Sequence, residues 1–128
     1  MKLLLQEDRF AICQLSAEAA IPRWAAQAPG LVATTRSREE LSVVCREDVV
    51  PLEIRQEKGW RAFMVEGPLD FGLTGVLAAI AGPLAVADIS IFALSTFHTD
   101  YVLVKEEKLE AAIKALQAAG HAVERLTA

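Results

Sequence analysis

A compact polar cluster at residues 95–100 offers hydroxyls from Ser95 and Thr96, an imidazole, and the carboxylate of Asp100. The stretches on either side are apolar and rich in β-branched or aromatic residues, which is typical of a mostly buried β-hairpin. A bend that carries such groups between stiff strands can hold a small polar ligand. The alternative interpretation is an ordinary solvated turn that Asp100 closes.

A glycine-containing loop ahead of an apolar helix is the second candidate. Gly72 and Gly75 flank the start of that helix, where free backbone N–H groups and the helix dipole favour a carboxylate. The carboxylate of Asp100 and the hydroxyls of the bend would then hold the ammonium group of an amino acid or a polar side chain. In the alternative interpretation, the glycines only shape a turn and Thr74 only caps the helix.

Other chemistries lack the residues that they need. His98 and Asp100 lie close in sequence, but no further ligand converges on them, so we predict neither a metal nor a cofactor. The sequence shows no nucleophile with a base and no pair of carboxylates, so we expect no catalytic activity. A net charge of −4 without a stripe of Lys or Arg argues against nucleic acid as a partner.

Composition predicts a soluble protein in a reducing compartment. At 128 residues and 53% hydrophobic content, the chain fits one compact domain or two very small ones. The N-terminus lacks a secretory pattern, and the most apolar stretch, residues 75–87, is broken by Gly82 and Pro83 and is too short to span a membrane. Cys13 and Cys45 are expected to be reduced core thiols, so we predict a cytosolic protein.

The elements that position the bend alternate between short strands and helices. We expect a turn at residues 7–9, a short helix beginning near Pro22, at most one helical turn at residues 48–51, and a helix after Glu106 that Gly120 caps. Leu73, Val76, Leu77, Ile80 and Leu84 fall on one face of the helix that follows the loop. The expected strands lie at residues 2–5, 10–15, 31–35, 40–45, 60–65 and 121–126, together with the hairpin at residues 93–104.

A weak internal repeat relates the two hairpins. Residues 34–44 match residues 94–104, with an acid, Glu40 or Asp100, ending each bend. From Trp60 the order is β-α-β-β-α-β, the ferredoxin-like pattern of an antiparallel sheet with two helices on one face. The first copy lacks an obvious second helix. The chain is therefore predicted to be an α+β protein built from duplicated β-α-β-β units.

Six short motifs along the chain carry a family resemblance. They are Thr74-Gly75, Pro83-Leu84-Ala85, Ile89-Ser90, Leu94-Ser95-Thr96-Phe97-His98-Thr99-Asp100-Tyr101-Val102-Leu103-Val104, Ile21-Pro22-Arg23-Trp24 and Glu40-Leu41-Ser42-Val43-Val44. These motifs resemble those of the ACT domain family. More narrowly, they are similar to the small double-ACT proteins related to aspartokinase regulatory regions and to the cytosolic arginine sensors of animal cells. The resemblance implies two tandem ferredoxin-like ACT units, an abbreviated one at residues 1–59 and a second at residues 60–128.

The same resemblance implies a regulatory protein without catalytic chemistry, which binds an amino acid at an interface between ACT units and forms a homodimer or a higher homo-oligomer. Thr96, Phe97 and Asp100 stand at positions where the arginine sensor contacts its ligand, whereas Asp70 stands where that sensor has a glycine. The alternative function is a ligand-free oligomerisation or protein-interaction module. The implied ligand-binding residues are Asp70, Phe71, Gly72, Thr74, Gly75, Ser95, Thr96, Phe97 and Asp100.

Overall fold

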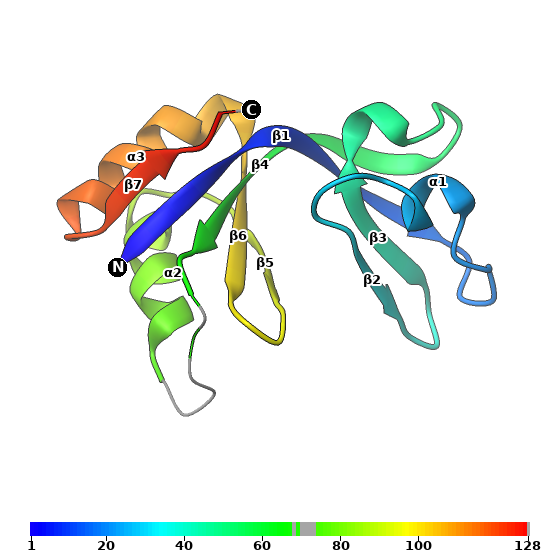
Figure 1. Cartoon of the computed structure of the whole chain (residues 1–128), viewed down its shortest axis with the longest axis horizontal. Helices are drawn as coiled ribbons and strands as arrows, with labels where there is room; N and C mark the ends of the chain where they lie inside the picture. The colour runs from blue at the N-terminus through cyan, green and yellow to red at the C-terminus, as the bar shows by residue number, and fades with distance from the viewer. Residues whose placement is uncertain (68, 70–73, 128) are drawn as a thin grey trace. The chain divides into compact units, whose positions relative to one another are not determined.

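The computed structural model describes residues 1–67, 69 and 74–127, and the chain divides into two compact units (Figure 1). The N-terminal unit is Asp8–Trp60, and the C-terminal unit combines Met1–Glu7 with Arg61–Ala128. The division expected from the sequence, 1–59 and 60–128, follows chain order, whereas the structure groups Met1–Glu7 with the later residues. The backbone pairing of these first residues explains the difference.

Strand β1 (Lys2–Leu15) supplies residues to both units. Its first part, Lys2 to Leu5, pairs in parallel with strand β7 (Ala122–Arg125) of the C-terminal unit. Its last part, Phe10 to Leu15, pairs antiparallel with strand β3 (Leu41–Arg46) of the N-terminal unit. The turn predicted at residues 7–9 is therefore wrong. No glycine, proline or asparagine bends the backbone there, and the polar side chains are accommodated on a continuous strand.

The N-terminal unit is an abbreviated β-α-β-β arrangement. Helix α1 (Arg23–Ala26) begins directly after Pro22, as expected, and 3-10 helix η1 (Glu47–Val49) provides the single turn predicted before the last strand. Strand β2 (Ala33–Arg36) pairs with β3, and strand β4 (Arg55–Val65) adds its first residues to this unit. The buried side chains of β1, β3 and α1 form its core, which includes both cysteines as free thiols.

The C-terminal unit has the expected ferredoxin-like order. Its elements follow β4 as α2 (Val76–Val86), β5 (Phe92–Ser95), β6 (Asp100–Lys105), η2 (Glu106–Lys108), α3 (Leu109–Ala118) and β7. β6 lies between β4 and β5, and β5 pairs antiparallel with β6 at the edge of the sheet. The parallel pairing of β7 with β1 is the departure from a purely antiparallel sheet.

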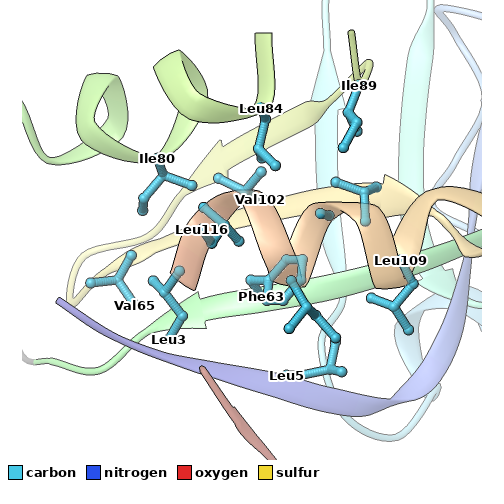
Figure 2. Close-up of a cluster of buried hydrophobic side chains, with 13 residues drawn as sticks. Leu3, Leu5, Phe63, Val65, Ile80, Leu84, Ile89, Val102, Leu109 and Leu116 are labelled. Carbon is cyan, nitrogen blue, oxygen red and sulfur yellow. The ribbon is translucent and has the colours of Figure 1, made fainter. Parts of the chain in front are cut away.

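Helices α2 and α3 cover one face of this sheet, and the main core lies between them and the strands. Phe63 and Val65 of β4 alternate with residues that face the other way, as do Val102 and Val104 of β6. Figure 2 shows core side chains from the strands and from both helices pointing toward one another. Those labelled are Leu3, Leu5, Phe63, Val65, Ile80, Leu84, Ile89, Val102, Leu109 and Leu116. The face carrying Met64 and Tyr101 is thus left uncovered by these helices.

The two hairpins repeat with a register that differs by one residue from the sequence match. Arg36 pairs with Leu41 in the first hairpin, and Ser95 pairs with Asp100 in the second. Glu40 therefore corresponds to Thr99 in the structure, and the counterpart of Asp100 is Leu41. The match between the two acids is thus wrong, because residue type and not hydrogen-bond register determined that alignment.

Every helix in the described part of the chain is too short or too polar to cross a lipid bilayer.

Candidate functional site

The bend of the C-terminal unit is held by hydrogen bonds among its own residues. The Thr96 N–H donates to the Thr99 carbonyl oxygen at 2.8 Å, and the Thr99 N–H donates to the Thr96 hydroxyl at 3.2 Å. The Ser95 hydroxyl donates to Asp100 Oδ1 at 2.5 Å. The polar groups that sequence reasoning assigned to a ligand therefore first shape the turn. Asp100 keeps its second carboxylate oxygen, Oδ2, outside this hydrogen bond.

Thr99 fastens the bend to the neighbouring strand. Its side chain is only 8% exposed, and its hydroxyl donates to the carbonyl oxygen of Val65, the last residue of β4, at 2.6 Å. This hydrogen bond fixes the bend relative to the point where the loop leaves the sheet. Sequence reasoning did not place Thr99 at the site, although a threonine beside a strand end is a suitable donor for such a bond.

The beginning of the loop that follows β4 contacts the bend directly. The Leu69 N–H donates to the His98 carbonyl oxygen at 2.7 Å. A Cβ atom at Gly67 would lie 3.1 Å from that same oxygen and 3.1 Å from the Leu69 nitrogen, so a side chain there would crowd the contact. The loop and the bend, which the sequence predicts as two halves of one site, are thus adjacent where the loop begins.

Only some of the remaining residues of the predicted loop are described by the structure. Asp70, Phe71 and Gly72 lie outside the described residues. Thr74 is exposed, and Gly75 is the N-cap of α2 with a φ of 76°, a left-handed conformation that glycine adopts readily. No side-chain hydrogen bond caps this helix, so the capping role considered for Thr74 is not observed.

Helix α2 continues through Pro83, although the sequence suggests that Gly82 and Pro83 kink or end it. Proline has no N–H, so the Ala79 carbonyl oxygen lacks its usual helical donor at position 83. His121, which precedes β7 and is 8% exposed, approaches that oxygen with Nε2 at 2.9 Å. Because a carbonyl oxygen only accepts, the imidazole donates its Nε2–H. This side chain replaces the missing backbone donor and holds the helix that carries the loop.

A cavity of about 480 Å³ lies beside the bend and the start of the loop. Among the described residues of the predicted set, Thr96 is the only one that lines it. Phe97 is 75% exposed and makes a T-shaped contact with the His98 ring, with centroids 5.4 Å apart, rather than lining the cavity. The described lining residues are Met64, Gly67, Thr96, His98, Thr99 and Tyr101.

Two of the lining residues that sequence reasoning missed, Met64 and Tyr101, carried a usable signal. Both alternate with core residues along their strands, so they project from the sheet face opposite helices α2 and α3. Burial raises the pKa of the Tyr101 phenol, which is consistent with a partly desolvated ring. Among the described residues, no group of three or more His, Cys, Asp or Glu side chains is arranged to hold a metal ion.

Cys13 and Cys45 belong to the core of the N-terminal unit. Both thiols are buried and free, as predicted. A hydrogen bond with Cys45, together with burial, raises the pKa of the Cys13 thiol, so it stays protonated at neutral pH. We therefore assign these cysteines to core packing.

Family models and several known proteins match this chain. The model of the ACT domain family matches residues 55–118, and a model of an N-terminal domain matches residues 8–53. The cytosolic arginine sensor for mTORC1 subunit 1 of Homo sapiens is 48% identical over 59 residues, which are 45% of this chain and 18% of the sensor. The matched segment is thus a small part of that longer relative.

Solved structures show the same fold over nearly the whole chain. An X-ray structure of a protein from Agrobacterium tumefaciens is 38% identical, covers 99% of this chain and 94% of that one, and has a TM-score of 0.93. The regulatory subunit of aspartate kinase from Thermus thermophilus is 16% identical, with coverage of 92% and 96% and a TM-score of 0.61. The second likeness shows the fold alone.

Proposed function

Since the chain belongs to the ACT domain family, we propose that it is a non-catalytic regulatory protein that binds an amino acid beside the bend of its C-terminal unit. The name of the arginine sensor supports a sensing role rather than a catalytic one. The proposal includes a cytosolic location and a homodimer or higher homo-oligomer.

The observation that carries the proposal is the cavity beside the contact between the loop and the bend. Its volume of about 480 Å³ lies in the range of small-molecule pockets, about 300–1,000 Å³. Its lining combines β4, β6, the start of the loop and the bend, so a ligand there would contact both halves of the predicted site. Binding would change the contacts of a loop that leads into α2.

The proposal assigns one partner to each charged group of the amino acid. Asp100 Oδ2 is available to an ammonium group, because Ser95 bonds to Oδ1. The N-terminus of α2 at Gly75 offers backbone N–H groups to a carboxylate. The proposed ligand set therefore remains the loop, with Asp70, Phe71, Gly72, Thr74 and Gly75, and the bend, with Ser95, Thr96, Phe97 and Asp100.

The proposed homo-oligomer would complete the site with a second ACT unit. β5 is the edge strand of its sheet, and an edge strand presents backbone groups that pair readily with another chain. Sedimentation velocity tests this part of the proposal separately. A monomer at micromolar concentration would contradict it.

A thermal-shift screen of the twenty amino acids tests the proposed function. A ligand that binds only the folded state at one hundred times its Kd stabilises it by about 2.7 kcal/mol, so the melting temperature should rise with concentration. Asp100→Asn should abolish the shift without lowering the melting temperature of the free protein. The matched control is Glu53→Gln, an exposed acid of the N-terminal unit, which should keep the full shift.

Two outcomes would contradict the proposal. A shift of equal size in Asp100→Asn would remove the bend from the site. No shift with any amino acid at millimolar concentration would favour the ligand-free oligomerisation module instead.

A further inference from the structure

The cavity beside the bend also indicates which class of amino acid it takes. This step rests on the proposed function. None of the described lining residues, Met64, Gly67, Thr96, His98, Thr99 and Tyr101, carries a carboxylate, an ammonium or a guanidinium group. Met64 and Tyr101 contribute a thioether chain and an aromatic ring, which adapt well to apolar groups.

The hydroxyl groups of the two threonines in the lining already donate to the protein. The Thr99 hydroxyl donates to the Val65 carbonyl oxygen at 2.6 Å, and the Thr96 hydroxyl donates to the Thr99 carbonyl oxygen at 3.2 Å. The His98 carbonyl oxygen accepts from Leu69 at 2.7 Å. A ligand that used these groups would compete with the bonds that shape the bend.

A cationic side chain in this cavity would lose water without gaining a carboxylate partner among the described lining residues. Transfer of an unpaired charge out of water costs far more than transfer of an uncharged group of the same size. Asp100 is not in the lining, and the proposed function assigns its free oxygen to the ammonium group of the ligand. We infer that the cavity selects amino acids with an uncharged, apolar side chain over those with a cationic one.

Norleucine and lysine form the matched pair for this test, because they differ only in the terminal ammonium group. Isothermal titration of the full chain should give a Kd for norleucine at least tenfold below the Kd for lysine. Methionine should likewise bind at least tenfold more tightly than arginine, whose longer side chain ends in a charged guanidinium group. Tighter or equal binding of lysine or arginine would overturn the inference and leave the proposed function standing.

Tyr101 reports directly on occupancy of the cavity, since it is the only tyrosine in the sequence. With ¹³C-labelled tyrosine, a single ring signal should shift on saturation with norleucine at neutral pH. With methyl-labelled methionine there are two signals, and that of Met64 should shift while that of Met1 stays. Norleucine binding without a shift at Tyr101 or Met64 would place the side chain elsewhere and overturn the inference.

Substitution of Met64 provides an independent check of the lining. Met64→Gln keeps the approximate length and shape of the side chain but makes it polar, so the Kd for norleucine should rise at least fivefold. Met64→Leu keeps the cavity apolar and should change that Kd less than twofold. If both variants bind norleucine like the parent chain, Met64 does not contact the ligand and the inference fails. Absence of binding by any amino acid to the parent chain would overturn the proposed function as well.

Discussion

The bends of the two units form the same turn, but different hydrogen bonds link each bend to its neighbouring loop. In the N-terminal unit the Ser37 N–H donates to the Glu40 carbonyl oxygen at 2.9 Å, and the Ser37 hydroxyl accepts from the Glu40 N–H at 3.3 Å. Thr96 and Thr99 make the equivalent pair of bonds at 2.8 and 3.2 Å. The same type of turn therefore forms in both units.

The loops that follow the first strand of each unit show the difference. In the N-terminal unit, the Arg36 guanidinium donates to the carbonyl oxygens of Ala17 and Ala19, so a side chain of the protein bridges the bend and the loop. In the C-terminal unit, the counterpart of Arg36 is Ser95, and among the described residues the loop and the bend are joined by the backbone hydrogen bond from Leu69 to His98. The cavity lies beside this contact. An arginine side chain thus links the bend to the loop in one unit, whereas no described side chain does so in the other.

The largest effect on stability is expected at His121, whose side chain donates to the Ala79 carbonyl oxygen of α2, the helix that follows the loop. The four-residue helix α1 of the N-terminal unit has no comparable hydrogen bond among the described residues. His121→Ala removes the donor to the Ala79 carbonyl oxygen. An unsatisfied buried acceptor costs about 1–3 kcal/mol, so urea unfolding should show a loss of that size. His121 Nδ1 also lies 3.2 Å from the Met1 amino nitrogen, so the single variant removes two contacts.

A double-mutant cycle isolates the contact with Ala79. Pro83→Ala restores a backbone N–H at position 83, which can donate to the same carbonyl oxygen. The cost of His121→Ala should therefore fall by at least half in the Pro83→Ala background. An equal cost in both backgrounds would show that the imidazole does not replace the missing helical donor.

The next effect concerns the contact between loop and bend. Gly67→Ala places a Cβ 3.1 Å from two backbone atoms, so it should lower the free energy of unfolding by about 1–2 kcal/mol and weaken amino-acid binding. Gly82→Ala is the same chemical change in α2, where a Cβ meets nothing within 4 Å, and it should stabilise the protein by about 0.5–1 kcal/mol. Equal and small effects of the two variants would mean that the backbone at Gly67 does not need its close approach.

Local patterns predicted the elements, whereas long-range contacts determined the details of the site. The hairpin around the bend, helix α3 and the single turn after β3 were predictable, because β-branched runs, helical spacing and turn residues act over a few positions. The continuity of β1 was not predictable, since it depends on pairing with β7 and β3, far along the chain. The passage of α2 through Pro83 likewise depends on His121.

The sequence predicted the bend as a part of the candidate site, but it did not predict the cavity beside the bend. Ser95, Thr96 and Asp100 attracted attention through residue type, and the structure shows Ser95 and Asp100 bonded to each other beside the cavity rather than lining it. Met64 and Tyr101 line it because of the face on which they lie. Alternation along each strand indicates that face, but the pairing that brings β4 and β6 together is a long-range contact. The sequence match followed residue type and therefore aligned Glu40 with Asp100, whereas the structural counterpart of Glu40 is Thr99.

A smaller effect is expected when the side-chain bridge of the N-terminal unit is removed. Arg36→Ser deletes the bonds to Ala17 and Ala19, and because the arginine is exposed, the loss of unfolding free energy should be about 1 kcal/mol or less. Arg36→Lys should not restore it, since an ammonium group lacks the planar fork that reaches two carbonyl oxygens. Full recovery with lysine would indicate that charge, not the bridge, supports this loop.

The smallest effect on stability is expected from the reciprocal change, Ser95→Arg. Ser95 is exposed, and its loss removes only the hydrogen bond to Asp100, so the unfolding free energy should change by no more than about 0.5 kcal/mol. An arginine at this register position should bridge to the loop after β4, as Arg36 does in its own unit, and exclude the ligand. Isothermal titration should then show loss of amino-acid binding by a folded protein. The matched control, Ser95→Lys, adds the same charge without the fork and should weaken binding less. If Ser95→Arg bound the ligand as well as the parent chain, the open cavity would not be the feature that distinguishes the two units.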